Sequence, residues 1–197
     1  MGRYVAFLRG VNVGGKNIIK MEQLRDVFRN NDCRNVLTYI NSGNVVFESD
    51  VVESELQNVC EDFLLEAFGF NVPVFAMTTS DFIDSLTNAP DWWNKSLDST
   101  HDIFYIIPPM TVEKVCNYIG PISGKHEKIA YTDKMIFWTA AEVTYYRSQW
   151  NRVFKDKLIF QGITVRNANT TLKVLEICKN FDKLHLVPRK NVFSHKR

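Results

Sequence analysis

Residues 3–21 read RYVAFLRGVNVGGKNIIKM, and this stretch decides the fold. Its first part, residues 4–8, is apolar on both faces, which is typical of a buried central strand. A loop with a glycine pair and a lysine follows at 10–16. From residue 21 to 31 the apolar residues recur at helical spacing, with charged residues on the opposite face. The chain therefore opens as strand, loop and helix.

The next segments extend this opening into a six-element unit. Two β-rich runs, 36–40 and 45–47, flank Asn41-Ser-Gly-Asn44, and turn residues between such runs predict a tight hairpin. Residues 50–53 have the spacing of a capping box, so a helix is expected to follow, and residues 72–77 are expected to form a strand, at an edge or starting at Pro73. The order strand, helix, hairpin, helix, strand is the β-α-β-β-α-β or ferredoxin-like plan.

The second part of the chain repeats this plan in pattern, with little identity of residues. The expected elements are a strand at 102–107, a helix at 111–119, a hairpin at 128–139, a helix at 145–158, a strand at 162–166 and a final helix at 170–181. In the expected helix at 145–158 the buried residues are Tyr146, Trp150, Val153, Phe154 and Leu158. Because the strands are apolar on both faces, the sheet faces without helices need cover from the other half or from a second chain.

The sequence thus predicts an α+β protein of two ferredoxin-like halves packed together, plus a C-terminal helix. The expected division is 1–78 for the first half, 79–100 for a helical connector, 101–181 for the second half with its terminal helix, and 182–197 for a mobile basic tail.

Composition and charge restrict the classes of function. Of the net charge of +2, residues 179–197 contribute +5, so the rest of the chain carries −3 and general affinity for nucleic acid gains little support. The four cysteines form no CxxC pair and no zinc-spaced cluster, so no metal or cofactor is expected. No secretory leader and no membrane-spanning run is evident, and a reducing cytoplasm is the simplest setting.

Residues 10–16 match the pattern G-x-x-x-x-G-K between a strand and a helix, which is the context of a phosphate-binding loop. Asn17 stands where such a loop needs Ser or Thr to hold magnesium, and the helix begins late, so a nucleotidase loop is not favoured. Two interpretations stay open. Backbone N–H groups near the glycines form an anion nest, or the glycines only permit a tight turn with positive φ.

Two further polar blocks follow. Residues 38–44 carry polar side chains at the expected hairpin tip, where they usually satisfy the turn itself. Residues 164–173 lead from a strand into a helix that Asn169 or Thr170 can cap, and the first-turn N–H groups can hold an anion with help from Arg166 and Lys173. The alternative is a capped helix with two surface cations.

No catalytic set stands out, because the four histidines have no Ser, Cys or Asp partner at a recognisable spacing. If the three polar blocks meet in space, they build one cleft for a small anionic ligand. The residues expected to bind it are Arg9, Asn12, Gly14, Gly15, Lys16, Asn41, Ser42, Asn44, Arg166, Asn167, Thr170 and Lys173. The alternatives are a nucleic-acid-binding module, suggested by the fold and the basic tail, and a protein-interaction scaffold without a pocket, suggested by the two-faced strands. The oligomeric state stays open.

The same blocks carry a resemblance. The segment Leu8-Arg-Gly-Val-Asn-Val-Gly-Gly-Lys16, the segment Thr38-Tyr-Ile-Asn-Ser-Gly-Asn-Val-Val-Phe47 and the segment Val165-Arg-Asn167 with Thr170 and Lys173 resemble the bacterial domain-of-unknown-function 1697 family. The resemblance extends over most of residues 3–180. It implies two ferredoxin-like halves in a cytoplasmic protein, with no established activity, cofactor or catalytic residue. Ala168 departs from the pattern, since many members have tryptophan there.

Overall fold

The computed structural model describes residues 1–122 and 127–185, in two successive groups of elements. The N-terminal half contains β1 (Gly2–Leu8), α1 (Met21–Asn30), β2 (Arg34–Tyr39), β3 (Asn44–Ser49), α2 (Glu53–Phe68) and β4 (Val74–Thr78). Helix α3 (Thr79–Thr87) follows. The C-terminal half contains β5 (Ser99–Ile106), α4 (Val112–Ile119), β6 (Glu127–Tyr131), β7 (Met135–Ala141), the 3-10 helices η1 (Glu142–Arg147) and η2 (Trp150–Phe154), α5 (Lys157–Gln161), β8 (Ile163–Asn167), α6 (Ala168–Lys179) and α7 (Phe181–His185).

Each half is built on one four-stranded antiparallel sheet. The strand orders are β2-β3-β1-β4 and β6-β7-β5-β8, so the first strand of each half lies in the interior of its sheet. This position explains why residues 4–8 are apolar on both faces, because a central strand in a covered sheet is buried on both sides. The prediction of a mixed α+β fold is confirmed.

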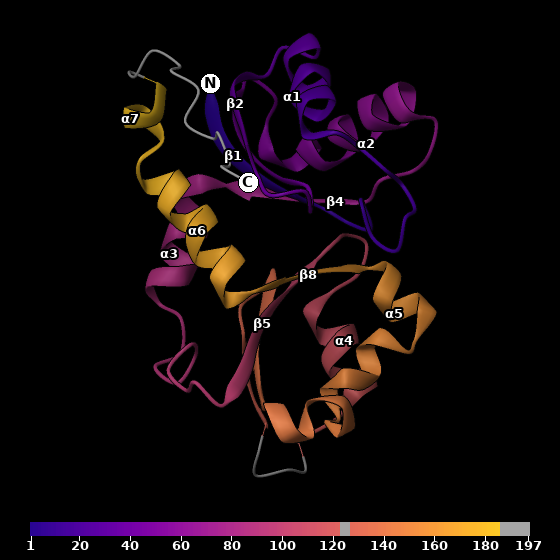
Figure 1. Ribbon diagram of the computed structural model, residues 1–197, viewed down its shortest axis with the longest axis vertical. Coiled ribbons are helices and arrows are strands. Elements are labelled where there is room, and N and C mark those ends of the chain that lie inside the picture. The colour runs from indigo at the N-terminus through magenta and orange to yellow at the C-terminus, as the bar shows by residue number, and fades with distance from the viewer. Residues whose placement is uncertain (123–126, 186–197) are drawn as a thin grey trace, which may run out of the picture.

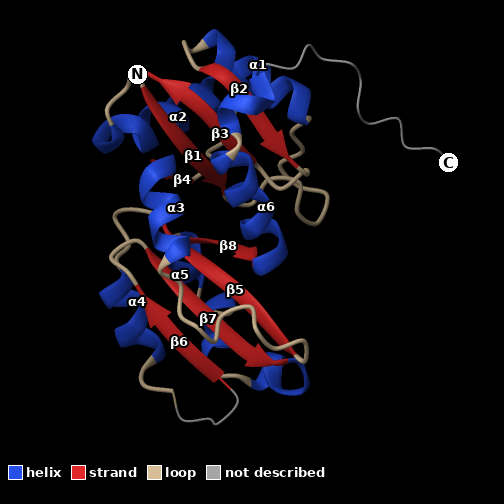
Figure 2. Cartoon of the chain, turned by 90° about the vertical axis from the view of Figure 1, so that its left-hand side faces the viewer, coloured by secondary structure: helices blue, strands red, loops and turns tan. Residues whose placement is uncertain are grey.

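The two sheets face one another across the centre of the molecule. Helices α1 and α2 cover the outer face of the first sheet, and α4 and α5 lie on the outer side of the second (Figure 1). Between the sheets lies a shared core, where the Phe7 ring stands 4.3 Å and the Phe75 ring 5.1 Å from the ring of Tyr105. Helices α3 and α6 lie side by side between the halves and complete this core (Figure 2). The helix-free faces therefore cover each other, which removes the motive for a scaffold with uncovered sheets.

The prediction of one helix at 145–158 is wrong. The segment forms η1, η2 and α5, and Tyr146 and Leu158, expected to be buried, are 81% and 76% exposed. The cause lies in Glu127 of β6, whose carboxylate accepts the backbone N–H groups of Gln149 and Trp150. A continuous helix needs these amides for its own hydrogen bonds, so it is interrupted there.

Two helix starts also differ from the sequence-based expectation. The residue that precedes α2 is Val52, which makes no side-chain capping bond, so the capping box expected at 50–53 is not formed. Helix α6 begins at Ala168 and is capped by Asn167, whose Oδ1 accepts the Thr170 N–H at 2.9 Å, instead of by Asn169 or Thr170. The last residue of β8 thus provides the cap.

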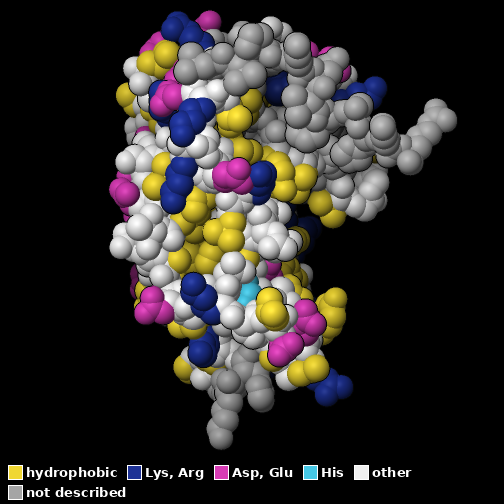
Figure 3. All heavy atoms as spheres, turned by 60° about the vertical axis from the view of Figure 1, so that its left-hand side comes forward, with side chains coloured by type: hydrophobic (Ala, Val, Ile, Leu, Met, Phe, Trp, Pro, Cys, Tyr) yellow, Lys and Arg dark blue, Asp and Glu magenta, His cyan; other side chains and the backbone are white. Residues whose placement is uncertain are grey.

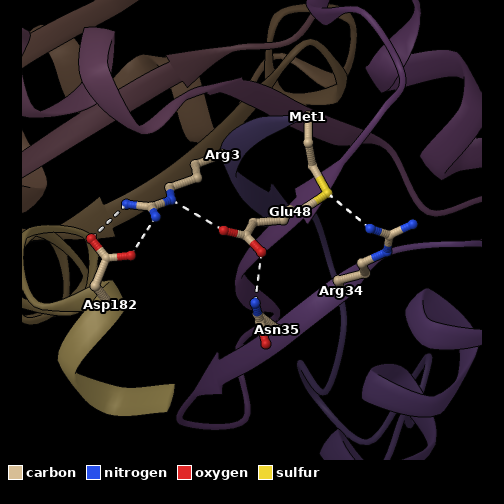
Figure 4. A network of polar contacts seen from close by, with 6 residues as sticks. All are labelled: Met1, Arg3, Arg34, Asn35, Glu48 and Asp182. Atoms are coloured by element: carbon tan, nitrogen blue, oxygen red, sulfur yellow. Dashed lines mark hydrogen bonds and ion pairs between the residues drawn. The ribbon is translucent and has the colours of Figure 1, made fainter. Parts of the chain in front are cut away.

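The C-terminal helix expected at 170–181 is divided into α6 and the short α7. Arg3 of β1 fixes α7, because its guanidinium donates to the carboxylate of Asp182 and lies 5.4 Å from the ring of Phe181 (Figure 4). The same guanidinium donates to Glu48, which also accepts from Asn35. Residues 182–185, expected within a mobile tail, therefore belong to a helix held on the first sheet, and 186–197 lie outside the described residues.

Partly buried apolar side chains reach the surface where α3 and α6 come forward. Figure 3 shows an apolar area near the middle of this face. Ile83, Trp92 and Ile177 are partly buried and pack against the shared core. Among residues 1–122 and 127–185, no helix is long and apolar enough to span a membrane.

Candidate functional site

Arg166 of β8 lies at the junction of the two halves, and its guanidinium is enclosed by oxygen atoms. Each of its five N–H groups has an acceptor. Nε donates to Asn44 Oδ1 at 2.5 Å, Nη1 to Thr164 Oγ1 at 2.9 Å and Val165 O at 2.8 Å, and Nη2 to Leu8 O at 2.8 Å and Ser42 O at 2.7 Å. Arg166 was expected to bind a ligand, but it has no N–H group left to donate to one. Instead it joins β8 to β1 and to the β2–β3 hairpin.

This guanidinium is buried without a carboxylate. Arg166 is 8% exposed, and no ion pair among the described residues includes it. Burial lowers its pKa to about 10, a value at which it still carries its charge at neutral pH. Its charge is balanced by carbonyl and amide dipoles and by the ring of Phe7, 5.3 Å away. Loss of this guanidinium would leave several of the oxygens around it without a hydrogen-bond donor.

The loop after β1 contacts the hairpin tip through Asn12. Its Nδ2 donates to Asn41 O at 2.7 Å and to Ile19 O at 2.9 Å, while its Oδ1 accepts the Ile19 N–H. Further along, Gly14 and Gly15 have φ of 58° and 74° and are the central residues of a two-residue turn. The Lys16 N–H donates to Val13 O in that turn, and the Lys16 side chain is exposed. This geometry agrees with the tight-turn interpretation of the glycine pair.

The hairpin tip packs closely on β1. Gly43 has a φ of +70°, and a Cβ at this position would lie 2.6 Å from Leu8 Cβ and 2.8 Å from Val11 Cγ2. Asn44 is buried, and its Nδ2 donates to Tyr39 O and Ser42 Oγ while its Oδ1 accepts from Arg166. The three polar blocks therefore do converge, the first two through the Asn12 contact and the last two through Arg166, but they meet as a packed junction.

The start of α6 lies at the other end of β8 from α5. Asn167 is exposed and occupied as a cap, and Lys173 pairs with Glu176 on the surface at 2.6 Å. Arg9 contacts α5, which precedes β8, and Lys173 lies on α6, which follows β8, so the two cations lie toward opposite ends of a strand that is about 16 Å long. The four cations expected around one cleft are thus not gathered together.

Arg9 differs from Arg166 in having donors to spare. Its Nε donates to Phe160 O at 2.8 Å, and its guanidinium carbon lies 4.7 Å from the centre of the Phe160 ring. Its backbone N–H bonds to Pro73 O, so both ends of the residue are fixed. Neither Nη group has a hydrogen-bond partner in the described part of the chain, and no carboxylate pairs with it there. Burial lowers the pKa of this half-buried group, which still remains cationic.

Several features near the junction of the halves have no signal in the sequence. Phe160, which contacts Arg9, lies on the short helix α5, whereas the helix expected in this region ended at residue 158. A cavity of about 840 Å³ lies between α2, β4 and the C-terminal half, and none of its residues was expected in a site. Only contacts between distant segments create these features, and local patterns do not report such contacts.

No metal centre is evident. In residues 1–122 and 127–185, no group of three or more His, Cys, Asp or Glu side chains could hold an ion. The four cysteines are free thiols. His101 of β5 is occupied by backbone partners, since its Nδ1 accepts the Asn94 N–H and its Nε2 lies 2.9 Å from Ser96 O.

The fold and the junction place the chain in a class of α+β proteins with two four-stranded sheets and a shared central core. The family model described as "Protein of unknown function (DUF1697)" matches residues 1–137, and the chain belongs to this family. Among solved structures it is similar to the conserved bacterial protein SP0830 from Streptococcus pneumoniae, with 29% sequence identity and a TM-score of 0.81 over 90% of this chain and 98% of that chain. A search of curated proteins finds no match. The resemblance seen in the sequence is confirmed.

Proposed function

We propose that the chain binds a small phosphate-bearing anion at the junction of its halves, with Arg9 as the main contact. The observation that carries the proposal is the guanidinium of Arg9, which is half-buried, oriented on Phe160 and without a carboxylate partner among the described residues. A charge withdrawn from water and left without a counter-ion favours an anion from solution.

The geometry of Arg9 favours phosphate over a simple halide. Because its Nε is held by Phe160 O, the two Nη groups form a planar fork, and such a fork matches two oxygens of a phosphate or carboxylate. Lys16, exposed on the turn of the same loop, supplies a second cation without fixed geometry. Arg166 supports the site from within by holding the start of that loop through Leu8 O.

Two finer features belong to the same proposal. The strand orders and connections of the two sheets support a chain of two ferredoxin-like halves, residues 1–78 and 101–181, joined by a connector at 79–100. The four free thiols support a reducing, cytoplasmic setting. The nucleic-acid alternative depends on the basic tail, of which 186–197 lie outside the described residues.

The test is thermal unfolding with inorganic phosphate, pyrophosphate and ADP, each added over a series of increasing concentrations. An anion at 100 times its Kd stabilises the fold by about 2.7 kcal/mol, which raises Tm by about 5–10 °C in a chain of this size. Arg9→Gln should remove this increase, and Arg9→Lys should reduce it because the fork is lost. Arg29→Gln, which removes an exposed cation of the same half, is the matched control and should leave the increase unchanged. Equal stabilisation of Arg9→Gln and of the unaltered protein would contradict the proposal.

A further inference from the structure

The open edge of β4 faces the largest of the described cavities. Strand β4 is the last strand of its sheet and, within residues 1–122 and 127–185, pairs with β1 alone. The cavity of about 840 Å³ lies along this edge, within the size range of ligand sites. Its lining consists of Glu53, Ser54, Gln57 and Asn58 from α2, Phe75 and Ala76 from β4, and Ile106, Pro108, Pro109 and Lys134 from the C-terminal half.

The ladder between β1 and β4 determines which backbone groups point into this groove. The Arg9 N–H donates to Pro73 O, so in an antiparallel ladder every second pair from there is hydrogen-bonded, and residues 74, 76 and 78 point away from β1. The Val74 N–H follows this rule, since it donates to the Glu61 carboxylate at 2.9 Å. The N–H and C=O of Ala76 point outward in the same way and have no partner among the described residues.

We propose that this groove binds an extended basic peptide segment of a partner protein, which adds as a short strand along β4 at Ala76. A strand at an exposed sheet edge gains backbone hydrogen bonds, and alternate side chains enter the adjoining pockets. Because the Glu61 side chain already occupies the Val74 N–H, pairing is restricted to about three residues centred on Ala76.

The preference for a basic peptide follows from the charges at the groove. Helix α2, which forms one wall, contains five acidic residues and no basic one, and two of these lie at the groove: Glu53 in its lining and Glu61 at the Val74 N–H. Lys134 is the cation in the lining, and its Nζ is engaged by Glu53 at 2.7 Å. This contact and the Gln57–Pro108 bond of 3.1 Å join α2 to the C-terminal half across the groove. Both are partly exposed, and exposed contacts of this kind exchange readily for a ligand's own.

The experiment measures the binding of a fluorescein-labelled heptapeptide of alternating valine and lysine by fluorescence anisotropy. Ala76→Pro removes only the outward N–H and leaves the pairing with β1 intact, so binding should weaken at least about tenfold, the value of one backbone hydrogen bond. Ala76→Ser keeps the N–H and is the matched control, with affinity within about twofold of the unaltered protein. A heptapeptide with glutamate in place of lysine should not bind.

The Glu53–Lys134 pair provides a second test that a general loss of stability cannot imitate. Removal of either partner breaks the same ion pair, but Glu53→Gln should weaken binding of the lysine peptide about threefold while Lys134→Gln should strengthen it about threefold. Hydrogen exchange of the Ala76 amide in the unaltered protein should slow when this peptide is added, a measurement that needs no variant.

Three results would overturn the proposal. These are unchanged affinity in Ala76→Pro, equal binding of the lysine and glutamate peptides, and unchanged exchange of the Ala76 amide. A dimer in light scattering that Ala76→Pro converts to a monomer would show that a second copy of the chain occupies the edge, which also overturns it.

Discussion

Replacement of Arg166 by methionine tests the role of the buried guanidinium. Methionine has similar length and fills the space, but it supplies no donor. Three of the oxygens that Arg166 contacts belong to the N-terminal half, namely Asn44 Oδ1, Leu8 O and Ser42 O. In the variant Asn44 Oδ1 and the half-buried Ser42 O lose this donor, Leu8 O keeps only the Thr164 hydroxyl at 3.4 Å among the described residues, and the contact between the halves loses its polar centre.

The magnitude follows from two opposing terms. Loss of a hydrogen bond at each of these three acceptors costs about 1–3 kcal/mol. Removal of the guanidinium also removes the cost of taking its charge out of water, which is several kcal/mol and acts in the opposite direction. We expect the first term to dominate, with a net loss of about 3–5 kcal/mol in the free energy of unfolding. For a chain of 197 residues this lowers Tm by about 6–20 °C.

The assay is urea unfolding followed by circular dichroism, with two comparison variants. Lys173→Met removes an exposed cation from α6 and should change the free energy of unfolding by less than about 0.5 kcal/mol. Arg166→Lys keeps the charge but loses the planar fork, so it should recover less than half of the stability. A loss below about 1 kcal/mol in Arg166→Met would refute the assignment of this residue as the tie between the halves.

Two further experiments test the packing and the electrostatics of the fold. Gly43→Ala should lower the free energy of unfolding by about 2–4 kcal/mol, because φ is positive and the new Cβ meets Leu8. Gly14→Ala, with a φ of +58° and open space around it, should lower it by about 1 kcal/mol. Equal losses of the two variants in thermal unfolding would contradict this explanation. Burial raises the pKa of Asp102 to about 6, so the folded state binds its proton more tightly than the unfolded state and loses stability as pH rises from about 4 to 6. The difference in the free energy of unfolding between Asp102→Asn and the unaltered protein should therefore shift by about 2 kcal/mol in favour of the variant when the pH is raised from about 4 to about 8. A difference in urea unfolding that does not change with pH would contradict the cause given.

The sequence predicted the structure well where an element depends on its own local pattern of residues. The apolar run at residues 4–8 and the turn residues at 41–44 lie in the expected elements. A helix also follows the strand that contains Arg166, as expected, but it begins at Ala168 and not at residue 170. The hypothesis that the three polar blocks meet was also fulfilled, because the positions that deviate from simple periodicity lie at the ends of β1, β3 and β8.

The remaining features depend on contacts that no local pattern contains. Arg9 and Arg166 were equivalent in the sequence, and only the packing of the halves distinguishes them. Arg166 has all its N–H groups satisfied, whereas the two Nη groups of Arg9 have no partner among the described residues. The interruption of the helix expected at 145–158 likewise depends on Glu127, which is distant in sequence. The groove beside β4 exists only because the second half lies against it.

The most direct measurement of the central claim is a phosphate titration followed by NMR of the arginine side-chain Nε–H groups. The claim is that the junction divides the two arginines into a structural tie, Arg166, and an available anion contact, Arg9. The account predicts a saturable shift of the Arg9 signal while the Arg166 signal stays in place. Movement of the Arg166 signal without movement of the Arg9 signal, or no shift in either, would contradict it.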